Sequence, residues 1–117
     1  MRNPVVLLFA ALLGTTAVNA GPGLDSLQVR TSSQCGMCKD RIEETLAFEK
    51  GVKSSSLDLE TKIVTVHYKA SKTTPEKIRK AISKVGYDAD DVAADGKAYE
   101  KLPACCKKPG DPDHVKH

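Results

Sequence analysis

Hydrophobic and polar residues alternate in several short stretches of this chain, and such alternation is typical of strands with one buried face. In residues 24–31, Leu27 and Val29 share a face, which predicts a half-buried first strand. Residues 52–59 and 63–69 alternate in the same way on either side of a polar turn, with apolar positions Leu57, Leu59, Val64, Val66 and Tyr68. These two stretches predict a hairpin.

Two other stretches have the three- and four-residue spacing of an amphipathic helix. Residues 37–50 are rich in helix-forming residues and place Ile42 and Leu46 one turn apart. Residues 74–86 start with a threonine suited to capping and a proline suited to the first helical position, and they end at a glycine. The apolar stripe of this second helix is Ile78, Ala81, Ile82 and Val85.

A weaker alternation in residues 87–94 predicts a final strand, although its aspartates disfavour one; the apolar positions are Tyr87, Ala89 and Val92. Residues 24–93 then read strand, helix, strand, strand, helix, strand. This order predicts an α+β fold of ferredoxin-like βαββαβ type, a sandwich in which two helices cover one face of a four-stranded antiparallel sheet. A C-terminal tail, residues 94–117, follows this domain, with a short helix expected over residues 96–102.

The first 20 residues have the pattern of a secretory signal peptide. They carry one positive charge at Arg2, an apolar run over residues 5–13, and small residues up to Ala20. The run is shorter than a helix that crosses a membrane. We therefore expect cleavage after Ala20 and a periplasmic or secreted mature form, small enough for one domain and expected to be monomeric.

Composition narrows the choice of partner. The chain of 117 residues has a formal net charge of +3, 4% aromatic residues and no Trp. A charge this close to zero gives no support for a nucleic-acid partner.

Cys35 and Cys38 stand two residues apart in "TSSQCGMCKD", between the predicted first strand and first helix. Unpaired backbone N–H groups at a helix start, with the positive end of the helix dipole, favour thiolates there. Two thiolates suit a soft ion of low coordination number such as Cu(I) or Hg(II). Structural Zn(II) normally takes four protein ligands, so it would need further sulfurs.

With these cysteines in this position, residues 24–93 resemble the heavy-metal-associated domain, found in copper chaperones, copper-transporting ATPases and the periplasmic mercury-binding protein. The family's loop motif is G-M-x-C-x-x-C, and the resemblance implies that Cys35 and Cys38 are the metal ligands. It also places Tyr87, in "VGYDA", near the metal loop. The chain departs from the motif at Ser32 and Ser33, which stand where the family has Gly-Met, and Met37 lies inside the motif instead.

The resemblance implies a metal-binding protein without enzymatic activity. Its cargo would be Cu(I) or Hg(II), passed by ligand exchange to a membrane metal transporter or another metal-binding domain. A sequestering buffer without a transfer partner fits the same residues. Met37 is a further candidate for contact with the metal through its thioether. The simpler interpretation is that its side chain packs against the protein or is exposed.

The tail adds a second pair, Cys105 and Cys106, which as adjacent residues are poorly placed to bridge each other. They are candidate additional ligands if "LPACCKK" folds back to the loop, which chain length permits. With them the site would also accept Zn(II) or Cd(II). The other reading is a mobile tail that acts alone. His114 and His117 could hold a borderline ion, but a polar chain end is usually solvated.

Two other roles for Cys35 and Cys38 remain open from the sequence. They could form a disulfide, which export favours. They could also belong to a thiol–disulfide exchange protein, because thioredoxin-like enzymes also carry C-x-x-C at a helix start. Against the enzyme, Pro75 begins a helix instead of preceding a strand that faces the cysteines, and no aromatic residue comes directly before Cys35.

Overall fold

A computed structural model describes residues 23–114. The predicted signal peptide over residues 1–20 and His117 lie outside the described residues. The sheet contains β1 (Leu24–Arg30), β2 (Val52–Asp58) and β3 (Ile63–Lys69), in the order β1-β3-β2 with antiparallel pairing throughout. The predicted first strand and hairpin are thus confirmed.

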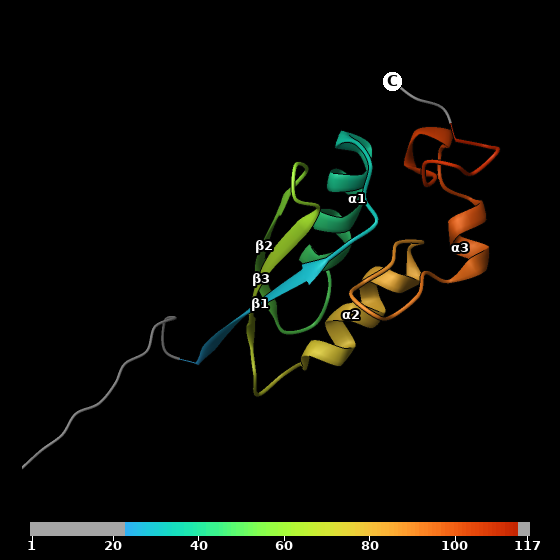
Figure 1. The fold of residues 1–117 in the computed structure, drawn as a ribbon. Helices are drawn as coiled ribbons and strands as arrows, with labels where there is room; N and C mark the ends of the chain where they lie inside the picture. The colour runs from blue at the N-terminus through green and yellow to red at the C-terminus, as the bar shows by residue number, and fades with distance from the viewer. Residues whose placement is uncertain (1–22, 115–117) are drawn as a thin grey trace, which may run out of the picture.

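Both predicted helices are present, and Figure 1 shows them on one face of the sheet. Helix α1 spans Gly36–Ala47 and α2 spans Pro75–Lys84. The Thr74 side chain accepts a hydrogen bond from the Lys77 backbone N–H at 3.2 Å, and the proline after it starts α2, as the sequence predicted. Beyond the C-terminal end of α2, Gly86 has a φ of 103°, in the left-handed region that glycine adopts without steric cost.

The core lies between the sheet and the two helices. Sheet residues on the covered face are buried against apolar residues of α1 and α2, and the main members are Val29, Leu57, Val64, Val66, Ile42, Leu46, Ile78 and Ile82. Each such side chain contributes roughly 1.5–3 kcal/mol by leaving water. The alternation and the helical spacing therefore mark the same interface from its two sides.

The predicted fourth strand is wrong. Within residues 23–114 the sheet has three strands, and Ala89 makes only isolated bridges, to Thr31 and to Val92. Asp90 has a φ of 54°, and the chain reverses there so that Ala89 pairs with Val92. Its carboxylate accepts a hydrogen bond from the Arg30 N–H at 2.9 Å and pairs with Arg79 at 2.8 Å. The Asp90 carboxylate thus binds groups of β1 and α2, and these bonds stabilise the turn in place of a strand.

Asp90→Ala is expected to lower the free energy of unfolding by about 1 kcal/mol, because aspartate tolerates the left-handed region better than alanine does. The hydrogen bonds add less, since the carboxylate is partly exposed. Burial opposes ionisation of Asp90, but the bonds from Arg79 and Arg30 outweigh it and lower the carboxyl pKa. This electrostatic part is present above the ordinary aspartate pKa and is lost as the pH falls through the lowered pKa.

Urea unfolding at neutral and acidic pH measures both parts of the Asp90 effect. The exposed neighbour Asp91 is the matched control, and Asp91→Ala is expected to change stability by less than about 0.5 kcal/mol. Equal effects of the two substitutions would contradict our account of the turn.

After the turn, the chain forms α3 (Gly96–Glu100) and the short 3-10 helix η1 (Ala104–Cys106). The short helix predicted in the tail is therefore confirmed. In Figure 1 the segment with η1, drawn in red, lies beside the N-terminal end of α1. Among the described residues, no helix is both long enough and apolar enough to span a bilayer.

Candidate metal-binding site

The loop between β1 and α1 places Cys35 and Cys38 at the start of the helix. Cys35 is the N-cap residue of α1, with an extended backbone and no side-chain cap, and its carbonyl accepts hydrogen bonds from the N–H groups of Cys38 and Lys39. Cys38 lies in the first turn and is fully buried. Both sulfurs are therefore near the positive end of the helix dipole, which favours thiolates.

Hydroxyl groups hold this loop, in the place where the family motif has Gly-Met. The Thr31 and Ser33 hydroxyl oxygens are 2.9 Å apart, both residues are buried, and Thr31 also donates to the Lys62 carbonyl at 2.9 Å. The Ser32 hydroxyl accepts the Asp88 N–H at 2.9 Å. Hydrogen bonds thus fix the loop to the turn between β2 and β3 and to the segment after α2. The sequence showed these serines only as a departure from a motif.

All four cysteines of the chain meet at this loop, and all are free thiols. The Cys35 and Cys38 sulfurs are 3.6 Å apart. Cys105 Sγ lies 3.2 Å from Cys35 Sγ, and Cys106 Sγ lies 2.7 Å from Cys38 Sγ and 3.8 Å from Cys35 Sγ. The sulfurs of Cys35, Cys105 and Cys106 lie within 4.8 Å of one another, close enough to share one ion. The structure thus brings the tail pair to the loop pair.

The thiols of Cys35, Cys105 and Cys106 differ in acidity. Burial acts to raise the pKa of Cys35, but its hydrogen bonds with Cys105, with the Cys38 N–H and thiol, and with the Met37 N–H lower it from 9 to about 7. Burial and the neighbouring Cys38 raise the pKa of Cys106, and the hydrogen bond with Cys35 raises that of Cys105. Cys35 is therefore the thiolate that is available near neutral pH to take up a soft ion.

The Tyr87 side chain lies close to the Cys38 and Cys106 sulfurs. It is fully buried, and its hydroxyl has no oxygen or nitrogen partner. Burial raises the pKa of the Tyr87 hydroxyl, and its contacts with the Cys106 and Cys38 sulfurs raise it further. The hydroxyl therefore stays protonated and is a donor for a neighbouring thiolate.

The other candidate ligands are placed differently. Met37 Sδ lies 3.6 Å from Cys105 Sγ, at the edge of the cluster, with its side chain about half exposed. His114 is engaged in the tail, where its Nδ1 meets the Lys107 carbonyl at 2.5 Å. The described residues therefore show a sulfur cluster without histidine.

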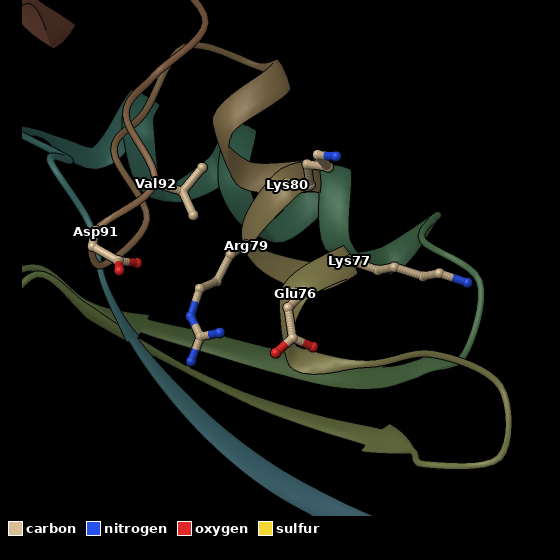
Figure 2. A pocket seen from close by; sticks show the side chains of 6 residues that line it. All are labelled: Glu76, Lys77, Arg79, Lys80, Asp91 and Val92. Atoms are coloured by element: carbon tan, nitrogen blue, oxygen red, sulfur yellow. The ribbon is translucent and has the colours of Figure 1, made fainter.

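A shallow hollow beside α2 is lined by charged side chains and contains no cysteine or histidine. Figure 2 shows the Arg79 guanidinium between the carboxylates of Glu76 and Asp91, with Lys77 and Lys80 along the same helix. Arg79 forms an ion pair with Asp90, and the charges of Glu76 and Asp91 act on it as well. We therefore assign the candidate site to the sulfur cluster.

Comparison with known proteins identifies the family. The model of the heavy-metal-associated domain matches residues 34–88. The copper chaperone CopZ of Staphylococcus epidermidis is 39% identical over 54 residues, which are 46% of this chain and 79% of the chaperone. A copper-exporting P-type ATPase of Staphylococcus saprophyticus is 38% identical over 55 residues, 47% of this chain but only 7% of the ATPase.

Solved structures agree on the fold. A CopZ metallochaperone superposes with a TM-score of 0.54 at 32% identity and covers 56% of this chain and 98% of its own. Oxidized MerP from Ralstonia metallidurans superposes with a TM-score of 0.55 at 20% identity, covering 57% of this chain and 94% of its own. The matched residues contain the Cys35–Cys38 loop and both helices, whereas the tail follows the matched range. The chain belongs to the heavy-metal-associated domain family.

Proposed function

We propose that this chain binds a soft metal ion, Cu(I) or Hg(II), through Cys35 and Cys38, and acts as an exported metal chaperone or scavenger without enzymatic activity. One observation carries the proposal: two thiols of a heavy-metal-associated domain lie 3.6 Å apart at the positive end of α1. The relatives above 30% identity are copper proteins, which favours Cu(I). The likeness to MerP concerns the fold.

Uptake and release proceed by exchange of sulfur ligands. The Cys35 thiolate forms the first metal–sulfur bond, and Cys38 loses its proton to solvent as it forms the second. On release, a partner's thiolate bonds to the ion before one of these two bonds breaks, and the oxidation state of the ion does not change. The partner would be a membrane metal transporter or another metal-binding domain, as in the copper-exporting ATPases that share the domain.

Export is the second part of the proposal. It is supported by residues 1–20, whose charge, apolar run and small residues are typical of a signal peptide. A periplasmic location exposes free thiols to oxidants, so a bound ion would also protect them. No observation on the site favours thiol–disulfide exchange, and the reduced protein is expected to show no catalytic turnover in an insulin reduction assay.

Native mass spectrometry tests the choice of metal. The reduced protein is offered Cu(I), Hg(II) and Zn(II) in competition, and we expect one soft ion per chain, with Zn(II) displaced, because thiolates prefer the softer ions. A chain that binds none of the three ions would contradict the proposal. A chain that keeps Zn(II) against both soft ions would contradict the choice of cargo.

A further inference from the structure

The tail is docked by contacts that do not involve its cysteines. Gly86, with its φ of 103°, lets the tail approach so closely that a Cβ there would lie 3.1 Å from the Ala98 backbone and from Leu102 Cδ2. Leu102 is buried in the core that Tyr87 also joins. The position of the tail is therefore part of the fold.

Polar contacts fix the tail on both sides of η1. Lys108 Nζ pairs with Asp88 at 2.7 Å, and the Lys108 N–H donates to the Tyr99 hydroxyl at 2.9 Å. That hydroxyl donates to Asp111 at 2.6 Å, and Lys107 Nζ donates to the Glu100 carbonyl at 3.0 Å. These bonds fix the chain before and after Cys105 and Cys106. Both sulfurs are therefore held beside the loop by a folded segment of the tail.

We propose that residues 95–111 form a cap that completes a four-thiolate metal site and closes it to a partner's thiols. The inference rests on the proposed function of Cys35 and Cys38. Cys105 and Cys106 would occupy the coordination positions that an incoming pair of thiolates needs during exchange. The cap therefore retains the ion, and release requires a tail sulfur to leave first.

Exposure of the sulfurs supports this order of events. Cys38 is 0% exposed, Cys106 1% and Cys105 6%, whereas Cys35 is only partly buried. An external thiolate can reach the ion only on the Cys35 side or after the cap has moved. A C-x-x-C pair that exchanges ions freely needs no such cover.

Tyr87 supplies a second, independent observation. Its fully buried hydroxyl has no oxygen or nitrogen partner and lies against the Cys38 and Cys106 sulfurs. An unpaired buried hydroxyl costs about 1–3 kcal/mol, which a hydrogen bond to a metal-bound thiolate would recover. A metal-bound thiolate of Cys38 or Cys106 would supply the missing acceptor, so the hydroxyl favours the ion-bound, capped state.

Four thiolates also change the range of ions. Zn(II) and the similar ion Cd(II) prefer four ligands in a tetrahedral arrangement. Four cysteine sulfurs supply all of these ligands, whereas two supply half of them. Cd(II) is therefore a sensitive probe of the cap, and Cu(I) reports on retention.

The test compares the wild-type chain with Cys105→Ser/Cys106→Ser and Cys35→Ser/Cys38→Ser. X-ray absorption and ¹¹³Cd NMR of the Cd(II) forms count the sulfur neighbours, and a Cu(I)-specific chelator measures the release rate. We expect four sulfurs in the wild type and two in the tail variant. We also expect the tail variant to bind Cd(II) about 100-fold more weakly, the lower end of what a tethered second ligand pair contributes, and to release Cu(I) faster.

Asp88→Asn keeps all four sulfurs but removes the charge that pairs with Lys108, with Lys101→Ala at an exposed tail position as its control. Faster Cu(I) release in Asp88→Asn than in Lys101→Ala supports a cap held by these contacts, whether or not the tail cysteine variant folds. Equal sulfur counts and release rates in the wild type and the tail cysteine variant would overturn the cap alone. Ions retained by Cys35→Ser/Cys38→Ser would overturn the proposed function itself.

Discussion

Cys35→Ser/Cys38→Ser is expected to abolish tight Cu(I) binding. Sites with four metal–ligand bonds bind structural zinc with about 10–16 kcal/mol, so losing two thiolates should remove about 5 kcal/mol or more and lower affinity more than 1000-fold. The hydroxyl that replaces each thiol is a poor ligand for a soft ion. Competition with a chelator of known Cu(I) affinity measures the loss.

The matched control is the pair in the tail. Cys105→Ser/Cys106→Ser makes the same chemical change on the same cluster but leaves both loop cysteines at the start of α1. It is expected to retain one Cu(I) per chain. If the two variants exchanged roles, so that only loss of the tail pair abolished Cu(I) binding, the C-x-x-C loop would not be the primary site.

Gly86→Ala is expected to lower the free energy of unfolding by about 2–5 kcal/mol. A side chain at a φ of 103° is strained by about 1–2 kcal/mol. The added Cβ would also lie 3.1 Å from the Ala98 backbone and Leu102, and overpacking of this kind costs a further 1–3 kcal/mol. Because the contact is with backbone, relief requires α3 to move away from α2. Thermal or urea unfolding measures the loss.

Gly96→Ala is the control for this substitution. Gly96 opens α3 where an added Cβ would have no heavy atom within 4 Å, and alanine favours helices, so no loss of stability is expected. Because the tail is docked at Gly86, Cu(I) release from Gly86→Ala should also be faster than from Gly96→Ala. If Gly86→Ala were as stable as the control, the close approach of the tail would not be a determinant of the fold.

The helices and the hairpin were predictable because their signals are local. Thr74 caps α2 and Pro75 starts it through contacts within one turn, and the alternation that ends at Tyr68 reflects a single buried face. The position of the C-x-x-C motif at a helix start was predictable for the same reason, since its spacing and its place after β1 depend on neighbouring residues. Family membership followed from this combination.

The fourth strand was not predictable in this way. The alternation of Tyr87, Ala89 and Val92 is compatible with a strand, but the long-range bonds from Asp90 to Arg30 and Arg79 stabilise a turn. Neither partner is close to Asp90 in sequence. The same holds for the Thr31–Lys62 and Ser32–Asp88 bonds that fix the metal loop.

The sequence by itself therefore determined the order of helices and strands up to α2, the family, and the loop pair that we propose as ligands, because each depends on periodicity or on residues within a few positions. Only the tertiary structure decided where the tail goes. Chain length allowed Cys105 and Cys106 either to return to the loop or to remain apart. The turn at Asp90, the close approach at Gly86 and the Asp88–Lys108 pair place them beside Cys35 and Cys38. Such contacts join distant segments, and pairing between distant residues leaves no periodic pattern in a single sequence.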